Sequence, residues 1–150
     1  MKKFAIIVLL FLIDRIVKYY FVQLQETGNE IDFFINPFLN FILVWNTGIG
    51  FGLVSLEANA WYHSFTAFIA IINIILIYIM LKLKGVYSIM FAVVIGGSLG
   101  NLFDRVYYYA VPDFIDLHYG NFHWFIFNIA DIFITIGILG LIILEMKKKD

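Results

Sequence analysis

Long apolar runs alternate with shorter polar segments along this chain, and their lengths predict four membrane-spanning helices. The apolar runs cover about 4–22, 61–81, 86–104 and 124–145. Each is close to the ~20 residues that an α-helix needs to cross the hydrocarbon core of a bilayer. The runs are separated by a tight basic turn and by two longer segments, about 23–60 and 105–123. We therefore expect a single α-helical integral membrane domain over residues 1–150.

The first long segment has a pattern of its own. Polar residues and glycines interrupt it, Pro37 breaks it, and residues 38–45 form an aromatic and β-branched run that predicts a strand. Glycines at alternate positions in 48–52 permit tight turns or close approach to another molecule. Residues 53–60 suggest a short helix lying on the membrane, because the aromatic pair at 61–62 is typical of a membrane boundary. This segment is therefore predicted to lie outside the bilayer.

Composition supports a membrane protein and excludes several other classes. Hydrophobic residues make up 63% of the 150 residues, and the mean hydropathy is +0.92. Both values lie outside the range of soluble globular domains. The chain has no cysteine, which excludes disulfides, thiol catalysis, thiolate metal sites and a lipid-modified cysteine. The net charge is −1 and no basic patch is interleaved with aromatic residues, so we expect no nucleic-acid partner.

The positions of the cations predict how the helices are oriented. Seven of the ten lysines and arginines fall at 2–3, 82–84 and 147–149, which four spans bring to one side of the membrane. Because cytoplasmic loops carry an excess of such residues, this side and both termini are predicted to be cytoplasmic. The two longer loops are then outside, and they carry several acidic residues but almost no lysine.

The segment 96–131 holds an unusual share of the polar residues. They are Asn101, Asp104, Arg105, Asp113, Asp116, Asn128 and Asp131. Ionisable side chains at membrane depth are costly, so they are more often functional than incidental. Asp104 ends an outward-going span, and Asp131 comes about seven residues into the returning one, roughly 10 Å below the outer surface at ~1.5 Å per residue. We therefore expect the polar groups to converge at the outer leaflet.

Two of these acids, Asp113 and Asp131, form the strongest candidate for a reacting pair. Two adjacent carboxylates share one proton, because like charges a few ångströms apart cannot both ionise cheaply. One then activates a water as a general base, and the other protonates a carbonyl oxygen as a general acid. This is the chemistry of peptide hydrolysis by an aspartic dyad.

The remaining polar residues have two readings each. Asn101 and Arg105 share one helix face, and Asn128 lies three residues before the second acid. The arginine could hold an anionic or carbonyl group, and each asparagine could either orient substrate or form an interhelical hydrogen bond. Asp104 could pair with a cation or cap a helix end, as a supporting residue of the site. Asp14 and Lys18, also on one helix face, either lower the cost of burying each other or take part in catalysis.

Two other motifs are weaker candidates for chemistry. Residues 96–100 match G-x-S-x-G, but that nucleophile elbow needs a strand, a turn and a helix, and here small residues in an apolar span favour close helix packing. His63, His118 and His123 lack the H-E-x-x-H spacing and are interpreted as interfacial or loop histidines. We therefore expect no metal site and no cofactor. Asn73 is interpreted as an interhelical hydrogen bond.

Five motifs, taken together, resemble a known family. They are the charged pair Asp14 and Lys18, the N-x-G block at 46–52, GGSLGNLFDR at 96–105, the D-F at 113–114 and FNIAD at 127–131. The last three, in this order and spacing, form a specific signature. Over essentially its whole length the chain resembles the lipoprotein signal peptidases, also called signal peptidase II.

The resemblance implies a fold and an activity. The fold is four transmembrane helices with a small extracytoplasmic β-cradle and a short interfacial helix. The activity is that of a metal-independent aspartic endopeptidase, which cuts the signal peptide from a prolipoprotein just before an S-diacylglyceryl cysteine. The family's catalytic aspartates match Asp113 and Asp131. Its substrate-holding residues match Asn46, Asn101, Arg105 and Asn128.

The resemblance also implies partners and a location. We expect a diacylglyceryl-modified prolipoprotein as substrate, contact with membrane lipid, inhibition by globomycin, and a monomer. The location is the bacterial cytoplasmic membrane, with the active site on the extracytoplasmic side. Some positions depart from the family pattern: Arg15 and Val17 replace a glutamine and a hydroxyl residue, Gly50 replaces an alanine, and Pro112 precedes the first acid.

Other functional classes remain as alternatives. A small proton-coupled transporter or channel subunit would also need acids and an arginine in the membrane. It should place them near the middle of the bilayer, often at interrupted helices, whereas here they gather at one side. A purely structural membrane scaffold leaves this gathering unexplained.

Overall fold

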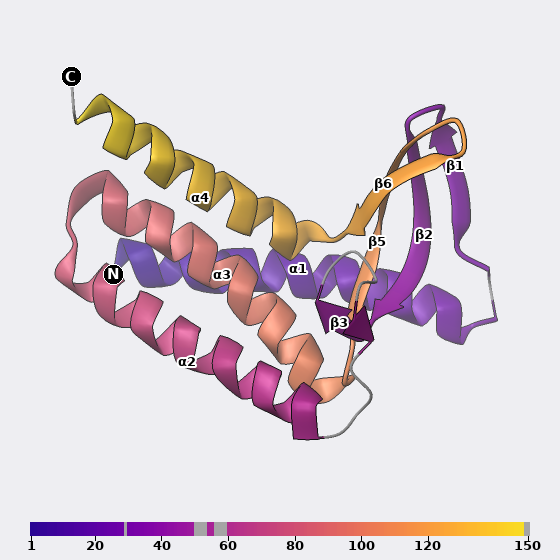
Figure 1. Ribbon diagram of the computed structural model, residues 1–150, viewed down its shortest axis with the longest axis horizontal. Helices are drawn as coiled ribbons and strands as arrows, with labels where there is room; N and C mark the ends of the chain where they lie inside the picture. The colour runs from indigo at the N-terminus through magenta and orange to yellow at the C-terminus, as the bar shows by residue number, and fades with distance from the viewer. Residues whose placement is uncertain (29, 50–53, 56–59, 149–150) are drawn as a thin grey trace.

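Four long helices lie side by side, and a small β-sheet projects from one end of them (Figure 1). The computed structural model describes residues 1–28, 30–49, 54–55 and 60–148. The helices are α1 (Lys2–Glu26), α2 (Ala60–Lys82), α3 (Gly85–Tyr107) and α4 (Ile129–Lys147). Both termini and the connection between α2 and α3 lie at the end of the bundle opposite the sheet (Figure 1).

The two long polar segments of the sequence meet in one antiparallel sheet of order β1-β2-β5-β6. Its strands are β1 (Asp32–Asn36), β2 (Leu39–Asn46), β5 (Val111–Tyr119) and β6 (Phe122–Phe127). The strand predicted at 38–45 is confirmed as β2. The pairing of β2 with β5 is what ties the first polar segment to the second.

A second, two-stranded sheet pairs β3 (Gly48–Ile49) with β4 (Val54–Ser55). The interfacial helix expected at 53–60 lies mostly outside the described residues, but its second and third positions form β4. Two of the glycines at 48–52, Gly50 and Gly52, also lie outside them.

The predicted start of the last helix is wrong. The apolar run was expected to begin a span at Trp124, but residues 122–127 form β6, and α4 begins only at Ile129. Hydropathy cannot separate a buried strand from a buried helix in a short apolar run. The aromatic residues of this run pair with β5, for example Phe127 with Ile115, and so continue the sheet to the edge of the bundle. Helix α3 (Gly85–Tyr107), by contrast, is longer than the span predicted at 86–104.

Helix α3 is the centre of the bundle and packs against α1, α2 and α4. Its glycines make this possible. A Cβ on Gly97 would collide with the carbonyl oxygen of Ala130 in α4, and one on Gly100 would collide with the carboxylate of Asp14 in α1. Ser98 lies in the same turns and accepts a hydrogen bond from Asn73 in α2, at 2.9 Å. The G-x-S-x-G match is therefore helix packing, as interpreted, and Asn73 joins two helices.

Three of the helices are long and apolar enough to cross a membrane: Tyr62–Lys82, Gly85–Tyr107 and Ile129–Lys147. Helix α1, which has 25 residues, does not belong to this class by composition, because Asp14, Arg15 and Lys18 stand in its second half. Its C-terminal half instead supports the sheet: Phe21 stacks on Phe114 of β5 with ring centroids 4.2 Å apart. This contact holds β5 against the bundle.

Candidate active site

The two candidate acids come from different elements that meet where the sheet joins the helices. Asp113 is the third residue of β5, is only 4% exposed, and pairs in register with Val44 of β2. Asp131 is the third residue of α4 and belongs to its first turn. It therefore lies about 4–5 Å along the helix from the cap, at ~1.5 Å per residue. The depth of seven residues expected from a span starting at 124 is wrong for this reason.

Asn128 holds both acids. As the N-cap of α4 it forms a reciprocal capping box with Asp131: its side-chain oxygen accepts from the Asp131 backbone N–H (3.2 Å), and its own N–H donates to Asp131 Oδ2 (3.1 Å). Its amide nitrogen donates to Asp113 Oδ1 at 2.5 Å. A single buried asparagine thus fixes the carboxylates of a strand and a helix relative to each other.

Every oxygen of the two carboxylates accepts one hydrogen bond, and each donor is an amide. Asn128 serves Asp113 Oδ1 and Asp131 Oδ2, as above. Asn46 donates to Asp113 Oδ2 at 3.0 Å, and Asn101 donates to Asp131 Oδ1 at 2.8 Å. A carboxylate oxygen has a further lone pair beyond one such bond. The pair is therefore held in place while keeping the capacity to bind a proton or a water.

The surroundings of Asp113 favour its protonated form. Burial out of water is the largest cause, and the nearby charge of Asp131 adds to it; together they raise the pKa of Asp113 from 3.8 to about 6. The hydrogen bonds from Asn46 and Asn128 act in the opposite direction but do not cancel the effect. This carboxyl is thus suited to exchange a proton near neutral pH.

A second polar cluster lies beside the first and has a different character. Asp14 and Asp104 are both fully buried, and each is paired with the same two cations. Lys18 Nζ lies 3.1 Å from Asp14 and 2.6 Å from Asp104, and Arg15 lies 2.8 Å and 2.5 Å from them. Asp14 also accepts from the backbone N–H of Ala130 at 3.0 Å, at the start of α4.

The predicted pair of Asp14 and Lys18 is present, but as part of this larger ion cluster. Asp104, expected among the supporting residues of the site, has both oxygens taken by Arg15 and Lys18. The sequence analysis did not assign a partner to Arg15. Its ion pair with Asp104, 89 positions further along the chain, forms only because α1 packs against α3.

The two clusters are joined by Asn101. Its side-chain oxygen accepts from Lys18 Nζ at 2.7 Å, while its amide nitrogen donates to Asp131 at 2.8 Å. Because the ammonium is a donor only, it fixes which end of the Asn101 amide faces the acid. The ion cluster therefore orients a donor toward the candidate dyad.

Arg105 lies next to the site. Its guanidinium donates to the backbone carbonyl of Asn101 at 3.2 Å and lies over the ring of Phe65, 5.8 Å from the centroid. Its charge acts on both Asp113 and Asp131. The side chain is partly exposed, which leaves N–H groups for another molecule.

One group of potential metal ligands was missed by the sequence analysis. It is formed by Asp116, His118 and His123, on the strands β5 and β6. The sequence does contain a pattern that could have revealed this group: a D-x-H triplet, a Gly-Asn pair and then a second histidine. If the Gly-Asn pair forms a hairpin turn, the three side chains come together. This group is separate from the candidate dyad.

Comparisons with known proteins show which family the chain belongs to. A family model described as "Signal peptidase (SPase) II" matches residues 6–147. The chain belongs to the signal peptidase II family. A lipoprotein signal peptidase of Pelagibacter ubique is 49% identical over 142 residues, covering 95% of this chain and 86% of that one. One from Dichelobacter nodosus is 37% identical over 149 residues, covering 97% and 94%.

Solved structures extend the match to the fold. A structure described as a bacterial membrane enzyme superposes with a TM-score of 0.82 at 30% identity, covering 99% of this chain and 90% of that one. The resemblance to signal peptidase II that was found in the sequence is thereby confirmed, and the chain is a peptidase of the membrane.

Proposed function

We propose that this protein is an intramembrane aspartic endopeptidase that removes the signal peptide from prolipoproteins. The bond cut lies just before the S-diacylglyceryl cysteine, and a water activated by Asp113 and Asp131 is the nucleophile. The observation that carries the proposal is that Asn128 donates a hydrogen bond to both carboxylates. Among the described residues, each of the four carboxylate oxygens accepts one hydrogen bond from an amide N–H.

The reaction follows from two acids that hold one proton between them. The ionised carboxyl takes a proton from the water, and the resulting hydroxide attacks the peptide carbonyl carbon. The protonated carboxyl gives its proton to the carbonyl oxygen, which forms a neutral gem-diol. Collapse of the diol breaks the C–N bond: the carboxyl that took the water's proton gives it to the leaving amine, and a diol hydroxyl gives its proton to the other carboxyl. The pair again holds one proton.

The neighbouring residues bind rather than react. Arg105, whose guanidinium has five N–H groups and whose charge acts on Asp131, is suited to hold a substrate carbonyl beside that acid. Asn46, Asn101 and Asn128 keep the carboxylates in position, and in this proposal they also limit how closely the substrate backbone can approach.

The protein is proposed to cross the bacterial cytoplasmic membrane four times. Helix α1 qualifies as the fourth span because its charges point into the bundle, where Asp14 and Lys18 are 0% and 1% exposed. Outward it presents apolar side chains such as Leu9, Leu12 and Ile16, which are compatible with lipid.

The orientation puts the dyad on the extracytoplasmic side. The lysines at 2–3, 82–84 and 147–148 belong to the end of the bundle opposite the sheet (Figure 1), so the positive-inside rule makes that end cytoplasmic. The scissile bond of a lipid-anchored precursor would meet the enzyme at the outer surface, where the sheet joins the helices. A transporter would instead need polar groups near the middle of the bundle.

The direct test is cleavage by the purified protein. A precursor peptide carrying an S-diacylglyceryl cysteine is incubated with the enzyme as a monomer in detergent, with and without globomycin, and the products are identified by mass spectrometry. We expect one cut immediately before the modified cysteine, blocked by globomycin. A peptide with an unmodified cysteine is the matched control and should be cut much more slowly. Equal cleavage of both peptides, or none of either, would contradict the proposal.

A further inference from the structure

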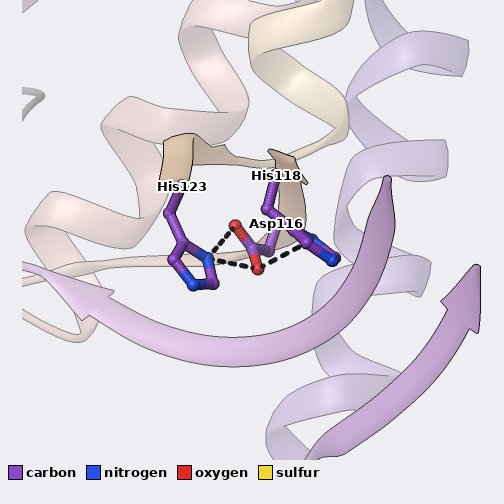
Figure 2. A group of neighbouring side chains, drawn as sticks. All are labelled: Asp116, His118 and His123. Carbon is purple, nitrogen blue, oxygen red and sulfur yellow. Dashed lines mark hydrogen bonds and ion pairs between the residues drawn. The ribbon is translucent and has the colours of Figure 1, made fainter. Parts of the chain in front are cut away.

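Three side chains at the far end of the sheet face one another (Figure 2). Asp116 and His118 are two residues apart on β5 and therefore share a face of the sheet, and His123 is the cross-strand partner of His118 on β6. Asp116 lies 2.8 Å and 3.0 Å, by its two oxygens, from His123 Nδ1. Its Oδ2 lies 3.5 Å from His118 Nδ1.

The turn and a bulge create this geometry. Gly120, at φ +58°, is the first of two residues that join the strands, the position that a type II′ hairpin turn reserves for glycine. The strand register shifts by one residue between Leu117 and His118, and this shift turns the imidazole of His123 toward the carboxylate of Asp116. Both histidines thus approach one acid from adjacent strands.

Two buried polar atoms at this place have no hydrogen-bond partner among the described residues. One is Nδ1 of His118, whose side chain is only 9% exposed. The other is Oδ1 of Asn40, which stands opposite Asp116 on β2 and so on the same face of the sheet. Leaving a buried polar atom without a partner is energetically unfavourable. The carboxylate of Asp116 is itself fully buried.

We propose that Asp116, His118 and His123 form a binding site for a divalent cation of borderline softness, with Zn²⁺ as the best match. Two imidazole nitrogens and one carboxylate oxygen are a common ligand set for zinc. Their candidate ligand atoms all lie within 4.8 Å of one another. In a tetrahedral site with ligands at ~2.0 Å, the ligand atoms are about 3.3 Å apart.

The distances from Asp116 Oδ2 to the two imidazole nitrogens, 2.8 Å and 3.5 Å, bracket that spacing, so small side-chain rotations suffice to admit the ion. The fourth position is open. A water, or the unpaired oxygen of Asn40, can fill it. His123 is 54% exposed and gives the ion a route from solvent.

The cation would act as a clamp on the sheet and not in the hydrolysis. It would join β5 to β6 near their turn, three residues or roughly 10 Å along the strand from Asp113. The proposal is independent of the peptidase chemistry, because it concerns a separate group of ligands. Its test therefore needs no measurement of activity.

The experiment uses the full-length protein in detergent, with its purification tag removed, after dialysis against a chelator. Co²⁺ is added as a spectroscopic substitute, and Zn²⁺ is added in thermal unfolding and in competition with Co²⁺. We expect one Co²⁺ per chain with the strong visible absorption of tetrahedral coordination. We also expect displacement by Zn²⁺ and a rise in Tm with Zn²⁺. A wild type without absorption and without a Tm shift would overturn the proposal and leave a hydrogen-bonded His-Asp-His group.

Variants locate the site. The variant His123→Gln should fold normally, because the side chain is exposed, and it is expected to weaken Zn²⁺ binding at least tenfold. The double variant His118→Gln/His123→Gln should abolish the Co²⁺ absorption. His63→Gln removes an exposed histidine of α2 and is the matched control, which should bind like the wild type. Undiminished binding by His123→Gln, or loss of binding in His63→Gln, would place the metal elsewhere and overturn the proposal.

Discussion

Two pairs of acids lie at low exposure where the sheet joins the helices, and their surroundings differ in one respect. Asp14 and Asp104 contact two cations, Arg15 and Lys18, which match their charge. Asp113 and Asp131 accept hydrogen bonds from asparagine amides and a backbone N–H, and within the described residues neither forms an ion pair. In the first pair the charges of acids and cations balance, whereas the second pair is held by neutral donors, which leave its two like charges unbalanced.

One small bundle can thereby hold two pairs of carboxyl groups with separate tasks. The ion cluster joins α1 to α3 and to the start of α4, and it also orients Asn101. In the proposed mechanism, the amide-held pair keeps the single shared proton that hydrolysis requires. If this division is correct, substitutions in the two pairs should fail in different ways.

The largest effect on activity is expected at the amide-held pair. Asp113→Asn and Asp131→Asn each remove one group of a proton-sharing pair. Because general acid and base catalysis contributes about 10²–10⁴-fold per group, kcat should fall by about 10²–10⁴-fold in each variant. The measurement is single-turnover cleavage of the lipid-modified precursor peptide.

Asp32→Asn, an exposed acid of β1, is the matched control and should keep full activity. Melting curves must show that the two variants of the pair still fold. Cleavage above a tenth of the wild-type rate by either folded variant would remove the basis for the comparison.

The ion cluster should fail by unfolding. Asp104→Asn leaves the buried Lys18 and the partly buried Arg15 with one acid, and breaking a buried ion pair in this way costs about 3–5 kcal/mol. We expect a large drop in Tm and in the amount of folded protein recovered. The double variant Asp104→Asn/Arg15→Met removes one charge of each sign and should recover part of the stability. A double variant no more stable than Asp104→Asn would show that charge balance is not the cause.

The free energy of unfolding should depend on pH through Asp113. The folded protein holds a proton on Asp113 up to about pH 6, whereas the unfolded chain releases it near 3.8. The folded state therefore binds more protons between these values, and its stability should fall as the pH rises through this window. A shift of roughly two pKa units corresponds to about 3 kcal/mol.

Thermal unfolding of the wild type and of Asp113→Asn, measured from pH 4 to 7, checks this. The variant should show the shallower dependence, because all other titrating groups are common to both proteins. Identical slopes would mean that Asp113 does not titrate in this range.

The sequence predicted the helices, the strand at 38–45 and the ion pair in the first helix, because each depends on local patterns of apolar and charged residues. It failed at the start of α4, where the aromatic strand 122–127 is as apolar as the helix that follows. Partners from distant elements, such as Arg15 with Asp104, depend on packing that no local pattern records. The group around Asp116 depends on a one-residue shift in strand register.

The smallest effect is expected at the residue that links the two pairs. Asn101→Leu removes the donor to Asp131 and the acceptor of Lys18 but leaves every acid and cation in place. Loss of one positioning hydrogen bond should reduce kcat about 10- to 100-fold, with KM nearly unchanged. The pH profile of kcat/KM should also change, because the lost donor serves a carboxylate of the proposed dyad. Asn73→Leu, which removes a hydrogen bond between α2 and α3 away from the acids, is the matched control for a purely structural loss. An equal fall in kcat for both variants, with no change in either pH profile, would mean that Asn101 only helps the helices to pack. The ion cluster would then have no effect on the reaction at Asp113 and Asp131.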